Sequence, residues 1–240
     1  MRILLTNDDG IDSDGIRVLA DILRSRRHRV YIIAPEANRS GISHAVSLLN
    51  GPVKLAARGE DTWACSGYPV DCVIAGIMGA LPEKPELVLS GINRGANLGT
   101  DIVYSGTAAA ARQASFSGIP AVALSLVANH SYHWDMAAAW SVDHLGELME
   151  YWKQNCFINV NIPNNPGGPA GIAITRPVVK NYNDSLHIMD APDGNRWCFM
   201  KAGVETTVRG TGDDWEQVSR NFVSVSPVYS YAAVINGEKG

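Results

Sequence analysis

Hydrophobic residues follow two different spacings along the first 160 positions. Continuous apolar or β-branched runs predict short buried strands at 3–6, 29–34, 62–65, 86–90, 120–126 and 157–161. Between several of these runs, apolar residues recur every three or four positions, as in the stretch that contains Ile16, Leu19 and Leu23, and this spacing predicts helices. Strands that alternate with helices form a parallel sheet covered on both faces, so the pattern predicts an α/β fold.

Other segments modify this pattern. Residues 36–57 are expected to form a loop followed by a hairpin that turns at Asn50 and Gly51. Residues 135–153 give the strongest helical pattern. Beyond Asn164 only short extended runs remain, at 171–175, 197–201 and 221–225. We therefore expect a core over residues 1–176 and a hairpin-rich, β-rich C-terminal arm over residues 177–240, packed on the core or on another subunit.

Composition restricts the function classes. The chain of 240 residues is 46% hydrophobic and 18% charged, which is typical of a globular protein, and its net charge of -4 argues against nucleic-acid binding. The N-terminal apolar run is too short for a signal peptide, and no run approaches the roughly 20 residues of a membrane span. The four cysteines form no CxxC pair, so we predict reduced core thiols in a cytoplasmic protein, without a disulfide framework or zinc site.

Unusual polar residues follow the predicted strands. Asp8 and Asp9 come directly after the first strand, Ser40 lies beyond the second, and residues 66–71 and 90–107 follow two further strands. Open parallel sheets bind ligands beyond the carboxyl ends of their strands. The sequence therefore predicts a ligand site where these loops meet.

Two adjacent carboxylates at a strand end repel each other unless a cation or a shared proton offsets their charge. A metal ion is one explanation for Asp8 and Asp9; the alternative is that either carboxylate only caps the next helix and shapes the turn. With Ser40 and Asn93, these residues offer oxygen ligands, which suit Mg²⁺, Mn²⁺ or Ca²⁺ rather than Zn²⁺. His44 is either a general acid or, more commonly for a lone histidine, a hydrogen-bonded structural residue.

The glycine-rich segment 91–106 lies between a predicted strand and a helix that begins near Thr107. Its backbone N–H groups and the helix N-terminus favour an anion, whereas a connector without a ligand is the alternative. Ser105 and Thr107 also suit helix capping. The chain lacks GxxxxGK[ST], a DxD after the first strand and GxGxxG after that strand, which argues against P-loop hydrolases, DxD phosphatases and dinucleotide binding.

Four segments together resemble the SurE family of stationary-phase survival proteins. They are TNDDG at 6–10, SGIS at 40–43, YPVDCV at 68–73 and LVLSGINRGANLGTDIVYSGT at 87–107. The resemblance extends to about Ser125, with a weaker match in TGDDWEQVSRNFVSVSP at 211–227. The chain departs from the family pattern at Tyr68, where threonine is usual, and at 112–114, and both departures bear on substrate preference.

The resemblance implies a metal-dependent 5′-nucleotidase with a Rossmann-like, three-layer αβα core. One divalent ion, Mg²⁺ or Mn²⁺, would be held by Asp8, Asp9, Ser40 and Asn93, with Asp8 or Asp9 also orienting the attacking water. The resemblance further implies a homodimer or homotetramer that is assembled through the C-terminal arm. The residues implied to contact the substrate phosphate are Asn97, Ser105, Gly106 and Thr107.

Two other functions remain open at the level of sequence. A nucleotide-binding regulatory subunit would use the same glycine-rich loop without hydrolysis. A sugar-nucleotide transferase is less compatible, since its acidic pair would lie in mid-chain and no second substrate-binding half is present. Nucleoside monophosphates are the expected substrates, and neither nucleic acid nor a membrane is an expected partner.

Overall fold

The structure is a computed structural model that describes residues 1–128, 130–203, 207 and 210–232. Its strands are β1 (Arg2–Thr6), β2 (Arg29–Pro35), β3 (Leu55–Gly59), β4 (Thr62–Cys65), β5 (Leu87–Arg94), β6 (Ala121–Val127), β7 (Cys156–Pro163), β8 (Gly171–Ile174), β9 (Ser185–Asp190), β10 (Arg196–Lys201) and β11 (Phe222–Tyr229). Its helices are α1 (Asp14–Ser25), α2 (Pro69–Ala75), the π-helix η1 (Gly76–Ala80), α3 (Asp101–Tyr104), α4 (Gly106–Phe116), α5 (Trp134–Asp143), α6 (Leu145–Glu150) and α7 (Asp214–Ser219).

A nine-stranded sheet in the order β3-β4-β2-β1-β5-β6-β7-β11-β8 forms the centre of the molecule. The strands from β4 to β7 are mutually parallel, whereas β3 and β11 run antiparallel to β4 and β7. After β1 the chain builds outward through β2 and β4, then crosses back to place β5 on the other side of β1. This reversal creates a crevice beyond the carboxyl ends of β1 and β5, the usual place for a ligand.

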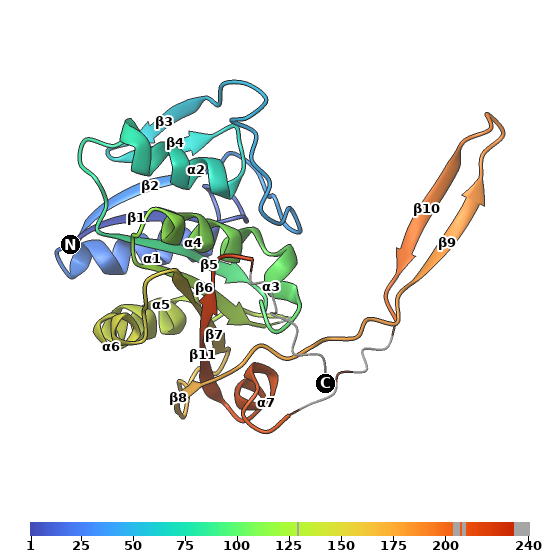
Figure 1. The fold of residues 1–240 in the computed structure, drawn as a ribbon. Helices are drawn as coiled ribbons and strands as arrows, with labels where there is room; N and C mark the ends of the chain where they lie inside the picture. The colour runs from blue at the N-terminus through green and yellow to red at the C-terminus, as the bar shows by residue number, and fades with distance from the viewer. Residues whose placement is uncertain (129, 204–206, 208–209, 233–240) are drawn as a thin grey trace, which may run out of the picture.

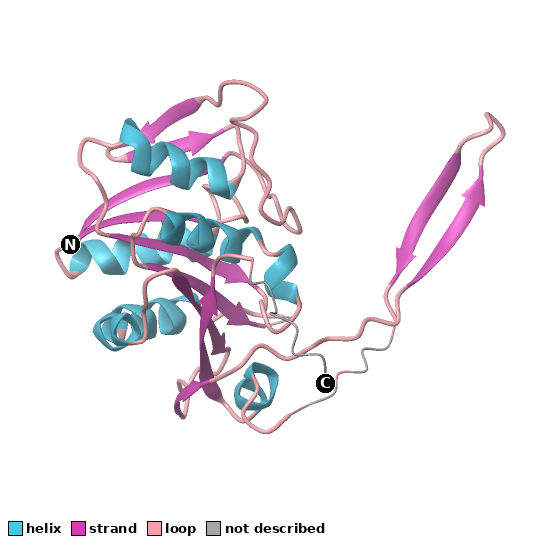
Figure 2. Cartoon of the chain, in the orientation of Figure 1, coloured by secondary structure: helices cyan, strands magenta, loops and turns pink. Residues whose placement is uncertain are grey.

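Successive apolar side chains of the buried strands point to opposite faces of the sheet, so both faces are covered by helices. Ile3 and Leu5 of β1 pack into one hydrophobic cluster with α1, α5 and α6, whereas Leu4 packs into a second cluster with α2 and α4. Each fully buried leucine or isoleucine contributes about 1.5–3 kcal/mol to folding. The result is the predicted three-layer α/β architecture, with helices on either side of the sheet (Figures 1 and 2).

Three sequence predictions differ from the structure. The hairpin turns at residues 60–61 between β3 and β4, not at Asn50 and Gly51, because the pairing of β4 with β2 fixes the register of β3. The helix predicted over 135–153 is divided at His144 into α5 and α6. Helix α7 was not predicted, because its six residues span less than two turns and are too short for a clear period.

The C-terminal region is divided between two places. Strand β11 inserts between β7 and β8 of the main sheet, and α7 packs beside it. Only the hairpin of β9 and β10 projects from the body (Figure 1). The arm predicted over residues 177–240 is therefore not one unit in the described chain, since a buried β-strand returns to the core after the hairpin.

The cysteines and the surface complete the description. All four cysteines are free; Cys65 and Cys72 are buried as expected, but Cys156 is half-buried and Cys198 is exposed on β10, so the prediction of four core thiols was wrong for two.

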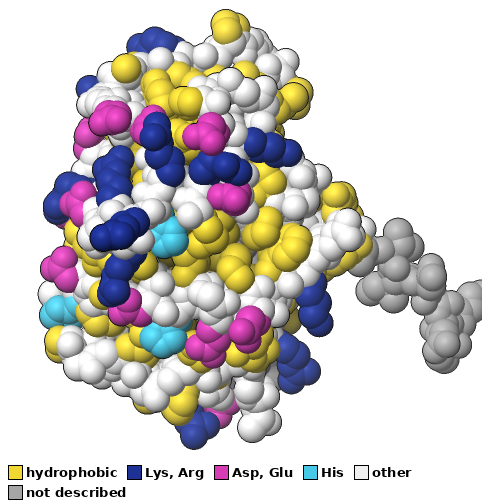
Figure 3. Space-filling view, turned by 90° about the vertical axis from the view of Figure 1, so that its left-hand side faces the viewer, with side chains coloured by type: hydrophobic (Ala, Val, Ile, Leu, Met, Phe, Trp, Pro, Cys, Tyr) yellow, Lys and Arg dark blue, Asp and Glu magenta, His cyan; other side chains and the backbone are white. Residues whose placement is uncertain are grey.

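Acidic and basic side chains are interspersed around a hydrophobic patch on the face drawn in Figure 3. Among the described residues, no helix is both long and apolar enough to cross a bilayer.

Candidate metal and phosphate site

The turn after β1 is built by an asparagine rather than by the two carboxylates. Asn7 Nδ2 donates to the Gly10 carbonyl oxygen at 2.8 Å and to Ser13 Oγ at 2.7 Å, and Gly10 N–H donates back to Asn7 Oδ1 at 3.2 Å. Gly10 has φ +102°, a conformation that favours glycine. The N-cap of α1 is Ser13, so neither Asp8 nor Asp9 caps this helix, and both carboxylates face other partners.

Asp8 is buried, with 4% of its surface exposed, and it lies against the N-terminus of α4. Thr107 Oγ1 donates to Asp8 Oδ1 at 2.5 Å, and Thr107 N–H donates to Oδ2 at 3.2 Å. A Cβ atom on Gly106 would lie 3.0 Å from Asp8 Oδ2, so glycine permits this close approach. Burial raises the pKa of Asp8, the Thr107 hydroxyl opposes that rise, and the charge of Asp9 adds to it.

Asp9 connects the tip of β1 to the tip of β5. Its Oδ2 accepts the Arg94 N–H at 2.9 Å. Burial raises the pKa of Asp9, and the Arg94 N–H and guanidinium charge act in the opposite direction. The β5–β6 ladder is irregular between Ser90 and Asn93, where Gly91 has φ +136°. A bulge of this kind redirects side chains at a strand end, and here it lies immediately before Asn93.

Asn93 and Ser40 lie on loops that are tied to the two carboxylates. Asn93 Nδ2 donates to the Gly95 carbonyl oxygen at 3.0 Å, and its Oδ1 has no hydrogen-bond partner in the described part of the chain. Arg39 N–H donates to the Asp8 carbonyl oxygen at 2.7 Å, which places the exposed Ser40 next to the turn. The fold thus holds four oxygen-bearing side chains on adjoining segments at the sheet tip.

The donor set fits a hard divalent cation. Asp8 is buried and Asp9 is half-buried, and two neighbouring carboxylates with raised pKa values are stabilised in their charged forms by a positive ion. Over the described ranges, no group of three or more His, Cys, Asp and Glu side chains is positioned to hold a metal. Any ion at this tip would therefore be completed by hydroxyl, amide or water oxygens, which suit Mg²⁺ or Mn²⁺.

The predicted phosphate contacts have different local roles. Ser105 is the N-cap of α4, where its Oγ accepts the Ala108 N–H at 3.0 Å. Thr107 is occupied by Asp8. The Ser105 hydroxyl hydrogen and the Gly106 N–H remain as donors at the positive end of the helix dipole, which is a favourable position for an anion.

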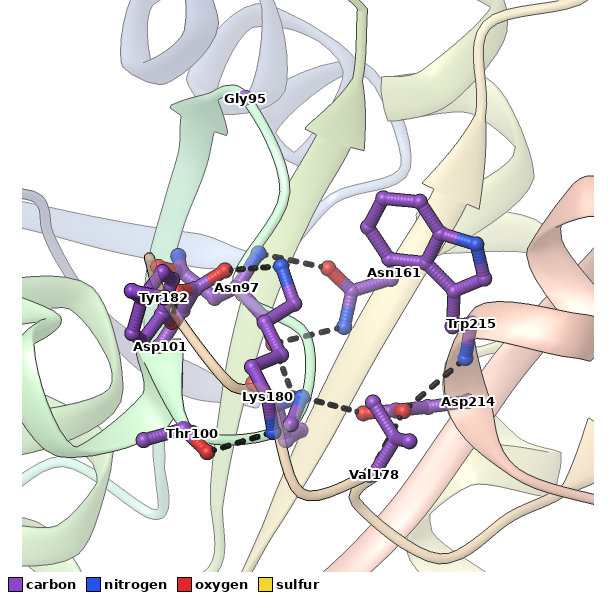
Figure 4. A network of polar contacts seen from close by, with 12 residues as sticks. Gly95, Asn97, Thr100, Asp101, Asn161, Val178, Lys180, Tyr182, Asp214 and Trp215 are labelled. Atoms are coloured by element: carbon purple, nitrogen blue, oxygen red, sulfur yellow. Dashed lines mark hydrogen bonds and ion pairs between the residues drawn. The ribbon is translucent and has the colours of Figure 1, made fainter. Parts of the chain in front are cut away.

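Asn97 belongs to the segment that we call the anion loop, residues 95–100. Its Nδ2 donates inward to Ser125 Oγ at 2.8 Å, and its N–H donates to Asn161 Oδ1 at 2.8 Å. The Asn97 carbonyl oxygen accepts from Asn159 Nδ2 at 2.9 Å and from Asn161 Nδ2 at 3.1 Å (Figure 4). In this structure, Asn97 fixes the anion loop on the sheet and does not open into the crevice.

Asn159 and Asn161 were not identified from the sequence. They occupy fully buried positions of β7, and both hold the backbone of the anion loop. Asparagine is uncommon in the interior of a buried strand, so two of them in FINVNIP were the available signal.

His44 lies away from this group. Its Nε2 is 3.0 Å from Gln113 Oε1, and its ring packs 5.8 Å from that of Phe116. Burial lowers the pKa of His44, with the Gln113 contact acting against that shift. Its recorded contacts are all with α4, which favours the structural role over general acid catalysis.

A cavity of about 340 Å³ borders the carboxylate turn. Asp9, Arg94 and Trp134 line it, together with the first turn of α1. Its position beside Asp9 provides room for the organic part of a small ligand.

Comparisons with known proteins give the chain a family. Residues 3–184 match the family described as Survival protein SurE. A protein named 5′-nucleotidase SurE from Desulfatibacillum aliphaticivorans is 38% identical over 95% of this chain and 92% of its own length. One with the same name from Stenotrophomonas maltophilia (strain R551-3) is 37% identical over 95% and 89%, respectively.

The fold leads to the same assignment. The crystal structure of the SurE protein from Aquifex aeolicus superposes with a TM-score of 0.84 at 33% identity, covering 97% of this chain and 95% of that one. The resemblance in the sequence motifs is thereby confirmed, and this chain belongs to the SurE family.

Proposed function

We propose that this protein is a metal-dependent 5′-nucleotidase that hydrolyses nucleoside monophosphates to nucleosides and inorganic phosphate. The observation that carries the proposal is the adjacent pair of the buried Asp8 and the half-buried Asp9, held at the tip of β1 between the glycine-rich loop and the N-terminus of α4. The names of the relatives, which match nearly the whole chain, support the same activity. No observation favours the non-hydrolytic alternative.

Asp8, Asp9, Ser40 and Asn93 would hold one divalent ion, Mg²⁺ or Mn²⁺. When bound, such an ion supplies charge neutralisation at a phosphate oxygen and lowers the pKa of a water molecule. The alignment of this oxygen set is provided by the protein: Thr107 fixes Asp8, and the Arg94 N–H fixes one oxygen of Asp9.

The remaining chemistry would come from groups that the structure leaves available. Asp9 Oδ1 has no hydrogen-bond partner among the described residues, so Asp9 is the better placed carboxylate to orient the attacking water. The Gly106 N–H and the Ser105 hydroxyl would bind non-bridging phosphate oxygens, because these atoms carry the negative charge of the phosphoryl group while it is transferred to water. The cavity beside Arg94 and Trp134 would receive the nucleoside.

We further propose that the protein is a homo-oligomer assembled through the arm hairpin, residues 185–201. Every residue of β9 and β10 is exposed, including Ile188, Trp197 and Phe199. An isolated two-stranded hairpin is marginally stable, and exposed apolar groups of this kind mark an interface. A second copy of the chain is the proposed partner. A cytoplasmic location remains a prediction from the sequence.

Phosphate release tests the proposed function. The wild-type protein should release inorganic phosphate from AMP with Mn²⁺ or Mg²⁺, and EDTA should abolish the release. Asp8→Asn and Asp9→Asn should each lower kcat/KM by at least about 10²–10³-fold, the scale for losing a preorganised electrostatic contact. His44→Gln is the matched control, with an expected change below about threefold if the histidine is structural.

Two results would contradict the proposal. The first is an EDTA-insensitive wild-type activity. The second is nucleotide binding by a folded, Mn²⁺-loaded protein that releases no phosphate, which would favour the regulatory subunit.

A further inference from the structure

Asp214 is one of the buried carboxylates that lie outside the group of proposed ligands. It is the first residue of α7 and has 0% exposure, but it does not cap this helix, because the N-cap is Asp213. Its carboxylate accepts the N–H groups of Gly99 at 2.7 Å, Val178 at 3.0 Å and Trp215 at 2.9 Å. A buried charge with three backbone donors is costly to lose, since each donor would be left without a partner.

The donors come from segments that are far apart in sequence but meet beneath the anion loop (Figure 4). Gly99 belongs to the anion loop, Val178 belongs to the strap, which we define as residues 176–182, and Trp215 belongs to α7. Asp214 N–H also donates to the Arg176 carbonyl oxygen at 3.0 Å. One side chain therefore joins the loop, the strap and the helix.

The strap lies directly on the anion loop. Gly99 has φ +56°, and a Cβ atom there would be 2.1 Å from the Val178 carbonyl oxygen. The next residues add two contacts: Lys180 N–H donates to Thr100 Oγ1 at 2.9 Å, and Lys180 Nζ pairs with Asp101 Oδ2 at 2.6 Å. The loop is thus held by the strap on one side and by the β7 asparagines on the other.

A displacement at Gly99 would reach the proposed phosphate contacts through α3. Ile102 N–H donates to the Gly99 carbonyl oxygen at 3.2 Å, and Ser105 N–H donates to that of Asp101 at 3.1 Å. The Tyr104 carbonyl oxygen accepts the Ser43 N–H at 2.9 Å, which links the same helix to the loop that contains Ser40. Backbone hydrogen bonds therefore connect Gly99 to Ser105 without a gap.

We propose that Asp214 is a positioning residue, which fixes Gly99 and thereby sets the position of the Ser105–Gly106 end of the phosphate site. This inference rests on the proposed function. It assigns the carboxylate a role at a distance, through the anion loop, and not in contact with the substrate.

Substitution by asparagine tests the role of the charge. Asparagine keeps the shape of Asp214 but offers one acceptor oxygen and turns an NH₂ group toward a backbone N–H. With the loop displaced, Asp214→Asn should lower kcat by about 10–100-fold, because displacements near 1 Å have effects of this size. The affinity for Mn²⁺ should fall by a smaller factor than kcat, because Asp214 contacts none of the proposed ligands and is linked to the Ser40 loop only indirectly, through α3. Asp214→Glu, which restores the carboxylate, should recover part of kcat.

Hydrogen–deuterium exchange gives a readout that does not depend on activity. Peptides that cover residues 95–104 should lose protection in Asp214→Asn, whereas peptides from β1 and β6 should keep theirs. Thr100→Val removes the acceptor of the Lys180 N–H and should give smaller losses of kcat and of protection over residues 95–104. This variant keeps the test possible if Asp214→Asn fails to fold. Thr175→Val is the matched control, because it removes buried hydrogen bonds to Ser224 and Ser226 away from the loop.

The outcomes separate the two proposals. If the Asp214 and Thr100 variants lose no more kcat than Thr175→Val at equal thermal stability, or if residues 95–104 keep their protection, the positioning role is overturned. If the wild-type protein releases no phosphate with any metal, the proposed function fails, and the exchange measurement alone decides whether Asp214 orders the loop.

Discussion

The carboxylate turn and the arm hairpin depart from ordinary burial in opposite directions. At the turn, the ionisable Asp8 is 4% exposed and is surrounded by donors from the same chain. On the hairpin, Trp197 is 62% exposed and Met200 is 75% exposed. Folded chains usually place charge outside and large apolar groups inside, so both regions are incomplete as they stand. We propose that a divalent ion offsets the charge of the carboxylates at the turn, and that a second copy of the chain covers the apolar side chains of the hairpin.

The largest expected effect is the loss of the oligomer when the arm hairpin is removed. The two ends of the hairpin lie close together, since a Cβ atom on Gly203 would be 1.7 Å from the Asn183 carbonyl oxygen. A Gly-Gly linker can therefore replace residues 184–202. Light scattering should show loss of the assembly, with a fall in mass of at least twofold to the monomer. The core should lose less than about 1 kcal/mol, because the hairpin buries almost no apolar surface on its own chain. Lys201→Ala should leave the mass unchanged; a truncated protein that stays assembled would contradict the proposed interface.

A smaller change at the turn should affect activity more than assembly. Gly106→Ala places a methyl group 2.9 Å from Asp8 Cβ and 3.2 Å from Ile42 Cγ2. Overpacking of this kind costs about 1–3 kcal/mol. We expect kcat/KM for AMP to fall at least about tenfold, because the carboxylate and the helix terminus separate. Gly146→Ala, at an exposed position of α6 where no atom lies within 4 Å of the added carbon, controls for the added methyl group. An active Gly106→Ala protein would argue against the tight packing.

The smallest effect concerns stability and pH. Burial raises the pKa of Asp8, the Thr107 hydroxyl opposes that rise and Asp9 adds to it, so the charged form of Asp8 is less stable in the folded chain than in the unfolded chain. This destabilisation disappears as the pH falls through the raised pKa. In EDTA, Asp8→Asn should therefore have a higher Tm than the wild type at pH 7.

The difference in stability between Asp8→Asn and the wild type should change in size with pH and in sign with metal. Scanning calorimetry should show the gap closing as the pH falls toward the ordinary pKa of an aspartate. Saturating Mn²⁺ should reverse the order, since about 2.7 kcal/mol is gained at a hundredfold excess over Kd only by the protein that binds the ion. A less stable Asp8→Asn protein at pH 7 in EDTA would show that the carboxylate pair is not strained without metal.

The sequence predicted the parts of the fold that depend on local pattern. Strands β1, β2 and β4 were predicted nearly at their observed bounds, because each carries the apolar run that a buried strand needs, whereas β5 was predicted to end at Ser90 and extends to Arg94. The hairpin turn was misplaced at Asn50 and Gly51, because turn propensity competes with the register that β2 imposes through β4.

At the candidate site, the sequence suggested candidate residues but not the contacts that hold them in place. Asp8, Asp9 and Asn93 stand out because polar residues follow apolar strands. The supports are contacts between distant positions: Asn161 is 64 residues from Asn97, and Asp214 is 115 residues from Gly99. No local pattern encodes such a pair, so only the folded chain identifies it.

The place of β11 has a consequence for synthesis on the ribosome. Residues 222–229 insert between β7 and β8, which are both translated more than 45 residues earlier, so β7 has an open edge until the end of the chain emerges. The hairpin is made during this interval. A chain terminated within or just after the hairpin would expose both the unpaired edge of β7 and the apolar side chains of the hairpin. This combination drives aggregation of nascent proteins.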